Sequence, residues 1–115
     1  GGQRQRAFLA LALAQDAKTL LLDEPTSFLD LHYQIQFLDL LKRLNKDQEI
    51  SIITVIHDVN LAARYCDRIA VLKDGRLIKV DSPLNVLTPE LMKDAFNVET
   101  CQINTPIGLQ ICTIK

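Results

Sequence analysis

The sequence predicts an α/β fold with a parallel core sheet flanked by helices. Two short apolar runs, residues 19–24 and 51–56, have the length and composition of buried strands. Segments with the composition or spacing of helices precede and follow each run, so strands and helices alternate in this part of the chain. That alternation is typical of parallel strands joined by helical crossovers.

Four elements are expected in the first half. Residues 4–15, "RQRAFLALALAQ", are rich in helix formers, and their apolar positions go almost all the way round, which predicts a mostly buried helix. "TLLLDE" (19–24) is predicted to be a strand buried on both faces. Residues 29–46 carry apolar side chains at helical spacing. "SIITVI" (51–56) is dense in β-branched residues and predicts a second buried strand.

The second half begins with Asp58, which is expected to cap a helix over residues 59–66. Residues 68–82 predict a β-hairpin, because apolar runs flank the turn Lys73-Asp74-Gly75. Ser-Pro and Thr-Pro pairs predict the starts of two short helices, in 82–87 and 88–96. The last stretch, 98–115, suggests short strands and a turn at Pro106, and an edge hairpin covering the sheet is the default expectation for it.

The chain length, net charge and cysteine count limit the class of protein. A chain of 115 residues suits one small domain or part of a larger one. The net charge of −1 gives no basic footprint for nucleic acid, and no apolar stretch approaches the roughly 20 residues of a membrane span. No signal peptide is expected from the opening Gly-Gly-Gln-Arg. Three cysteines without CxxC spacing favour packing roles in a reduced, cytosolic setting: Cys66, Cys101 and Cys112.

Acidic residues and a histidine follow the two predicted strands. Asp23-Glu24 ends the first strand and His57-Asp58 ends the second, so parallel strands would bring them to the sheet edge where α/β proteins bind ligands. A glycosidase is disfavoured, because neighbouring residues on a strand point to opposite faces and Pro25 is expected to keep Glu24 extended. The carboxylates should therefore have different tasks, one reaching Mg²⁺ or its water shell and the other orienting a nucleophile.

Three motifs then resemble one family in order and spacing. "LLLDEPTSFLD" (20–30) resembles the Walker B segment and D-loop of ATP-binding-cassette (ABC) ATPases. "GGQRQR" (1–6) resembles the tail of their LSGGQ signature, and "VIHD" (55–58) resembles their switch-histidine strand. Residues 57–99 are similar to the importer branch serving iron-siderophore, haem and cobalamin uptake.

The resemblance implies a partial P-loop NTPase-like fold, with residues 1–115 as the carboxy-terminal part of one ABC nucleotide-binding domain. It implies an ATP-hydrolysing, energy-coupling importer subunit on the cytoplasmic face of the membrane, peripheral to it. The implied partners are a second ATPase subunit, in a homodimer, and transmembrane permease subunits, with no nucleic acid. Since no GxxxxGK[ST] loop occurs, the Walker A half is missing and this chain alone is expected to be inactive.

Residue roles carry over from the same resemblance. Asp23 would hold Mg²⁺ through water, and Glu24 would act as general base or water-positioner for attack on the γ-phosphate of ATP. His57 would contact that phosphate. The D-loop crossing to the second subunit is implied at Ser27, Leu29 and Asp30, and the signature contacts to ATP bound by that subunit at Gly1, Gly2 and Gln3.

Other interpretations stay open at this point. A cassette ATPase acting in DNA repair or translation would predict long coiled-coil insertions or basic arms, and none appear. A non-catalytic truncated remnant or interaction module is the third possibility.

Loss of the strand that carries the phosphate loop would also leave apolar faces of residues 19–24 open, which predicts poor solubility or association.

Overall fold

The computed structural model describes residues 2–114, without the side chains at positions 4, 5, 8 and 12. The chain forms two compact units, Gly1–His57 and Asp58–Lys115. The described strands pair in three two-stranded sheets: β1–β2 in the first unit, and β3–β4 and β5–β6 in the second. No helix of the described part is long and apolar enough to cross a membrane.

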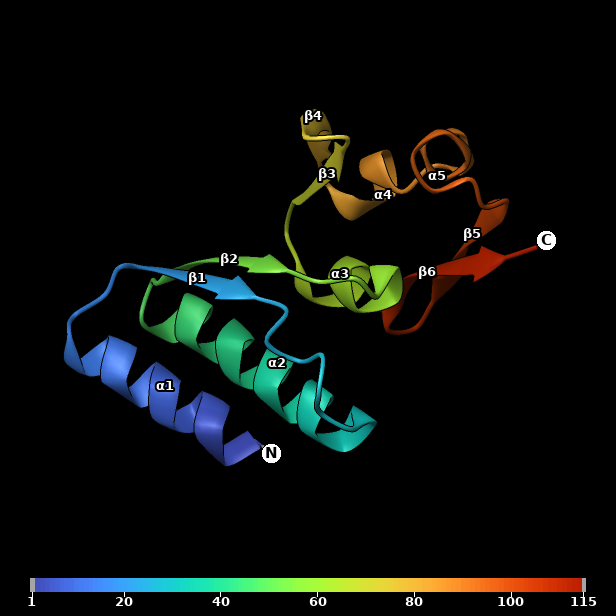
Figure 1. The fold of residues 1–115 in the computed structure, drawn as a ribbon. Helices are drawn as coiled ribbons and strands as arrows, with labels where there is room; N and C mark the ends of the chain where they lie inside the picture. Colours follow the sequence, from blue (N-terminus) through green and yellow to red (C-terminus); the bar gives the residue numbers. More distant parts are fainter. Residues whose placement is uncertain (1, 115) are drawn as a thin grey trace. The chain divides into compact units, whose positions relative to one another are not determined.

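The first unit alternates helices and strands as predicted. Its elements are α1 (Gly2–Ala14), β1 (Thr19–Asp23), α2 (Leu31–Asp47) and β2 (Ser51–Val55). The two strands are parallel, in a register that pairs Thr19 with Ser51 and Asp23 with Val55. Both helices lie along one side of this sheet (Figure 1), and the α/β class with a parallel core is confirmed.

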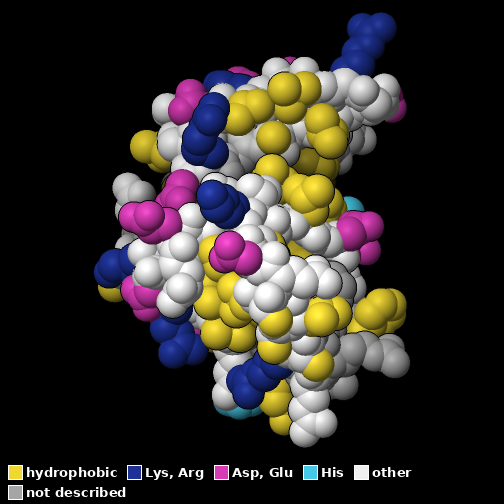
Figure 2. Space-filling view, turned by 90° about the vertical axis from the view of Figure 1, so that its left-hand side faces the viewer, with side chains coloured by type: hydrophobic (Ala, Val, Ile, Leu, Met, Phe, Trp, Pro, Cys, Tyr) yellow, Lys and Arg dark blue, Asp and Glu magenta, His cyan; other side chains and the backbone are white. Residues whose placement is uncertain are grey.

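Only one face of the β1–β2 sheet is covered within the first unit. Leu20 and Leu22 are 4% and 9% exposed, whereas Leu21 between them is 72% exposed and Ile53, its partner in register, is 62% exposed. The predictions of a strand buried on both faces at 19–24 and of a second buried strand at 51–56 are therefore wrong, because in this unit both helices pack on the same side. The open apolar face expected from the sequence is present at Leu21 and Ile53. Figure 2 shows hydrophobic side chains at the surface on one side of the molecule, without marking which strand they belong to.

The helix α1 also differs from its prediction. It begins at Gly2, two residues before the predicted start, and it is not mostly buried. Among its described side chains Leu9 is buried, but Leu11 and Leu13 are exposed. A helix that packs along one side can bury only one stripe of its surface, so the remaining leucines face outward.

The helix α2 is amphipathic and contributes three buried side chains to the first unit's core. Its buried side chains are Phe37, Leu38 and Leu41. Arg6 Nη2 donates to Gln36 Oε1 over 3.3 Å and joins α1 to α2. Asn45 Nδ2 donates to Ile50 O over 2.8 Å, which fixes the connection between α2 and β2.

The second unit contains every element predicted for it, as follows: α3 (Val59–Tyr65), β3 (Ile69–Lys73), β4 (Arg76–Asp81), α4 (Pro83–Val86), α5 (Pro89–Phe96), β5 (Thr100–Thr105) and β6 (Gly108–Thr113). Asp74 and Gly75 both have positive φ, the conformation that a two-residue hairpin turn requires. Thr88 caps α5 by accepting a hydrogen bond from Leu91 N. Asp58 caps α3 by accepting from Asn60 N and Leu61 N.

The core of the second unit lies among its helices, the strand β3 and the β5–β6 hairpin. It consists of Val71, Val86, Leu87, Met92 and Ile111. The hairpin contributes Ile111 to this core, and its two strands pair only with each other in the part of the chain that the structure describes. The default expectation is an edge hairpin covering the sheet; within the second unit, the hairpin forms a sheet of its own that packs on α3 and α5.

Candidate functional site

The carboxyl ends of β1 and β2 bring three of the predicted site residues together. Asp23 is the last residue of β1 and pairs with Val55, the last residue of β2. Glu24 N donates to Val55 O over 3.2 Å, so the ladder extends one residue past the strand. His57 follows Val55 by two residues, which places it at the same edge. Within the first unit Asp23, Glu24 and His57 therefore lie at the carboxyl-terminal edge of the β1–β2 pair, the edge at which open α/β sheets generally bind ligands.

The backbone at Glu24 corrects one prediction. Glu24 has φ of 48°, in the left-handed region, and is not held extended by Pro25. Its N–H still completes the ladder while its C=O accepts from Ser27 N over 3.2 Å, so the chain must turn sharply at this one residue. A non-glycine residue in this region costs about 1–3 kcal/mol, and such strain is common where a site must aim a side chain.

Glu24 and His57 are in direct contact. His57 Nε2 hydrogen-bonds to Glu24 Oε1, with the His57 side chain 77% exposed and that of Glu24 40% exposed. At this exposure water weakens the interaction, so the contact orients the two groups more than it stabilises the fold. The sequence predicted that both groups share an edge, and the structure adds that they bind each other.

The loop between β1 and α2 is fixed by buried and hydrogen-bonded residues. Thr26 and Leu29 are buried, and Leu29 N donates to Thr26 O over 3.1 Å. Gln34 Nε2 donates to Thr26 O over 3.1 Å and ties the loop to the first turns of α2. Gln34 was not predicted from the sequence to bind this loop. The only sign of such a role in the sequence is a polar side chain in the first turns of the helix that follows the loop.

The predicted D-loop residues have three different environments. Ser27 is exposed, Leu29 faces inward, and Asp30 caps α2 by accepting from Tyr33 N over 3.1 Å. Phe28 between them is 99% exposed. Three of the four side chains from 27 to 30 are therefore available at the surface, while Leu29 anchors the loop.

The predicted signature residues lie at the amino end of α1. Gly2 is the first residue of that helix, and the Gln3 side chain is exposed. Gly1 lies outside the described residues. The free N–H groups and the positive dipole end of a helix amino terminus suit an anion, which is the chemistry that the resemblance implies here.

The residues at this edge supply only part of the ligand set that a Mg²⁺ ion needs. Asp23 supplies an exposed carboxylate, a hard oxygen ligand of the kind that Mg²⁺ accepts. Across residues 2–114 as described, no three His, Cys, Asp or Glu side chains cluster to hold a metal on their own. Mg²⁺ commonly uses one or two carboxylates and takes its other ligands from water and phosphates, so Asp23 fits such a shared site.

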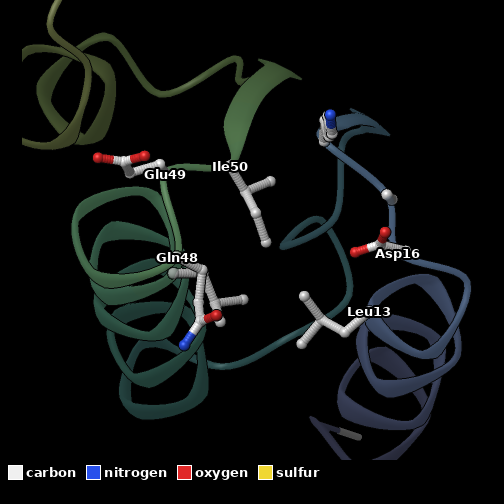
Figure 3. Close-up of a pocket in the computed structure, with 8 residues that line it drawn as sticks. Leu13, Asp16, Gln48, Glu49 and Ile50 are labelled. Carbon is white, nitrogen blue, oxygen red and sulfur yellow. The ribbon is translucent and has the colours of Figure 1, made fainter.

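A pocket of about 400 Å³ lies elsewhere in the first unit (Figure 3). Leu13 and Ile50 point into it, and Asp16 and Gln48 lie at its rim. Lys18 and Ile50, which line it, directly precede β1 and β2, so it adjoins the amino ends of the strands. It is therefore separate from the acidic edge at the carboxyl ends.

Comparison with curated proteins shows close relatives. The chain is 46% identical over 114 residues to the petrobactin import ATP-binding protein FpuD of Bacillus anthracis, covering 97% of this chain and 41% of that protein. It is 48% identical to the iron(3+)-hydroxamate import ATP-binding protein FhuC of Bacillus subtilis, covering 92% of this chain and 39% of that protein. The chain thus spans about two fifths of the length of these relatives. No protein-family model matches it.

Solved structures agree in fold. A metal-chelate type ABC transporter in an inward-facing conformation superposes with a TM-score of 0.84 at 30% identity, over 98% of this chain and 45% of that chain. A dimeric ATP-binding cassette bound to ADP and Pi gives a TM-score of 0.62 at 38% identity, over 71% and 35%. The resemblance predicted from the motifs is therefore confirmed: the chain is homologous to the ATP-binding proteins of ABC importers and has part of their P-loop NTPase-like fold.

Proposed function

We propose that this chain is the carboxy-terminal part of an ABC nucleotide-binding domain, and that its β1–β2 edge takes part in ATP hydrolysis coupled to import. The contact between Glu24 and His57 at the ends of two parallel strands is the observation that carries the proposal. The contact supports the proposal because a carboxylate and an imidazole lie together at the sheet edge where α/β proteins generally bind ligands. The adjacent Asp23 adds the carboxylate for a metal ion.

Each of these residues has a distinct task in the proposal. Asp23 would hold Mg²⁺ through water, and the ion would supply charge neutralisation on the phosphates. Glu24 accepts a proton from the attacking water, or orients that water. His57 orients the Glu24 carboxylate through Nε2 and contacts the γ-phosphate. Phosphoryl transfer depends on positioning and charge stabilisation more than on covalent chemistry, and this set of residues supplies both.

The partners follow from the relatives. FpuD and FhuC are named import ATP-binding proteins, and one structural neighbour is a dimeric cassette. We therefore propose a homodimer in which the exposed residues Ser27 and Asp30 and the signature residues Gly1, Gly2 and Gln3 face the second subunit. Transmembrane permease subunits would hold this dimer on the cytoplasmic face of the membrane.

The names of the relatives are the observation that limits which solute is proposed as the cargo. Their names specify petrobactin, iron(3+)-hydroxamate and, for the Halobacterium salinarum protein BtuD, cobalamin. BtuD is 47% identical to this chain over 97 residues. We propose an iron-siderophore or cobalamin-type chelate as the cargo.

A chimera tests the proposal. The amino-terminal part of Bacillus subtilis FhuC, joined to residues 1–115, supplies the phosphate loop that this sequence lacks. We expect Mg²⁺-dependent ATP hydrolysis that falls by about 10²–10⁴-fold in Glu24→Gln, the range of a general base, while ATP binding is kept. The matched control is Glu49→Gln, since Glu49 is also exposed and of positive φ but precedes the amino end of β2. Equal activity of the two variants would refute the proposed role.

A further inference from the structure

The β5–β6 hairpin places two cysteines directly opposite each other. In the antiparallel register Cys101 pairs with Cys112, and both are free and partly buried. Their separation of eleven positions in the sequence gives no recognisable motif, because only the position of the turn brings them together. The cysteine arithmetic that favoured three packing residues did not anticipate this pair.

The register that joins them is held at both ends of the hairpin. At the turn, Thr105 Oγ1 donates to Gly108 O over 2.7 Å and accepts from Ile107 N over 3.3 Å. At the open end, Ile114 N donates to Glu99 O over 3.0 Å. A slip of one residue would break both sets of hydrogen bonds, so the Cys101–Cys112 pairing is well specified.

A third set of hydrogen bonds, made by Asn60, holds β6 directly beside Cys112. Asn60 of α3 donates from Nδ2 to Ile111 O over 3.1 Å and accepts at Oδ1 from Ile111 N over 2.6 Å. The amide thus satisfies both backbone groups of the residue that precedes Cys112. Ile111 itself is 6% exposed in the core, so β6 cannot rotate freely about its axis.

The strand geometry brings the two thiols within reach of a disulfide. Opposite residues in antiparallel strands have Cα atoms about 4.5–5.5 Å apart, and disulfides span Cα separations of roughly 4.4–6.8 Å. Opposite Cβ atoms lie about 4.5–5.5 Å apart, at or beyond the upper end of the roughly 3.5–4.5 Å that a relaxed disulfide prefers. A bond closed here is therefore strained, and strained disulfides are the readily reduced ones.

The pair lies on the side of the hairpin away from the core. Ile111 packs into the core and Thr100 is buried, and both lie on the opposite face because side chains alternate along a strand. Cys101 and Cys112 share their face with Ile103, which is 45% exposed. Both thiols keep partial exposure, so small oxidants can reach them.

We propose that Cys101 and Cys112 form a reversible redox pair that closes under peroxide and opens under thiol reductants. One thiolate attacks a hydroperoxide, breaks its O–O bond and becomes a sulfenic acid while hydroxide leaves. The second thiol then attacks that sulfur and displaces water, so two thiols are oxidised and one peroxide is reduced. The disulfide staples β5 to β6 and is reopened by thiol–disulfide exchange.

The test oxidises the full 115-residue chain with hydrogen peroxide and measures intact mass. We expect a monomer lighter by two hydrogen atoms, a chymotryptic map that links the peptides carrying Cys101 and Cys112, and full reversal by dithiothreitol. The variant Cys66→Ser should behave identically. Crosslinks that join separate chains, or that contain Cys66, would overturn the proposal.

A swapped variant supplies the matched control. Cys112→Thr combined with Thr113→Cys keeps the composition but moves the thiol to the other face of β6. We expect this chain to accumulate sulfenic and sulfinic acids at Cys101 in place of the internal disulfide. Equal disulfide yield in the swapped and unchanged chains would show that register does not control the reaction, and would contradict the proposal.

Discussion

Glu24 and His57 contact each other across the ends of two neighbouring parallel strands, His57 through Nε2 and Glu24 through Oε1. The contact depends on the turn at Glu24, whose φ of 48° sends the chain away from the sheet directly after the last ladder hydrogen bond. This contact between a carboxylate and an imidazole at the sheet edge is the observation on which the proposed role in ATP hydrolysis rests.

The isolated chain is predicted not to hydrolyse ATP. Residues 1–115 contain no GxxxxGK[ST] loop, so the backbone cradle and the lysine that hold the β- and γ-phosphates are lacking. Phosphate release from Mg²⁺-ATP should equal the rate in buffer. Turnover by the purified chain that requires Mg²⁺ and disappears in Glu24→Gln would show this expectation to be wrong.

The open face of the β1–β2 sheet is predicted to drive self-association. Leu21→Thr combined with Ile53→Thr removes two side chains that are 72% and 62% exposed, so sedimentation at rising concentration should show less association. The matched control is Leu20→Ala on the covered face, which should instead lower the free energy of unfolding by about 2–5 kcal/mol. Unchanged association in the double variant would mean that another surface is responsible.

Asn60 is predicted to stabilise the second unit. Asn60→Ala leaves the N–H and C=O of buried Ile111 without their side-chain partners, and each unsatisfied group costs about 1–3 kcal/mol. Urea unfolding should therefore show a clear loss of stability. Asn104→Ala, at an exposed position on β5, is the control and should change the free energy of unfolding by less than about 0.5 kcal/mol. Similar values for both variants would argue against the bridging role.

Asp81 is predicted to make the second unit sensitive to acid. The N–H of Ser82 and then the side chain of Asn85 hold the pKa of Asp81 below its ordinary value of 3.8, with Lys79 contributing in the same direction. Because the folded pKa is the lower one, the stabilisation is complete above the unfolded value and is lost as pH falls through the folded pKa.

Asp81→Asn should accordingly flatten the acid limb of the curve of unfolding free energy against pH, below about pH 4. Asp94→Asn, at an exposed position on α5, serves as the comparison variant. If the two variants gave the same acid limb as the unchanged chain, the hydrogen bonds to Asp81 would have no role in stability.

Local signals in the sequence predicted most of the elements. Asp74-Gly75 predicted its hairpin because both positions need positive φ, and Thr88-Pro89 predicted the start of α5 through a cap and a fixed φ. Asp58 predicted the start of α3 in the same way. These features depend only on neighbouring residues, so no tertiary information was needed.

Features that depend on distant residues were predicted less well. The exposure of Leu21 depends on which face of the sheet the helices cover. An apolar run in the sequence does not indicate which face that will be. The left-handed turn at Glu24 results from the competing hydrogen bonds of its N–H and C=O, which outweigh the preference that Pro25 imposes. The Cys101–Cys112 pairing required the hairpin register.

The most direct test of the account is a double-mutant cycle on Glu24 and His57 in the FhuC chimera. ATP hydrolysis is measured for Glu24→Gln, His57→Ala and the double variant, with ATP binding as the check on folding. If the two side chains act as a unit, each single variant should lose about 10²-fold or more and the double variant little more than the worse single. Losses that multiply, or a His57→Ala variant with full activity, would contradict the proposal that the contact between Glu24 and His57 serves hydrolysis.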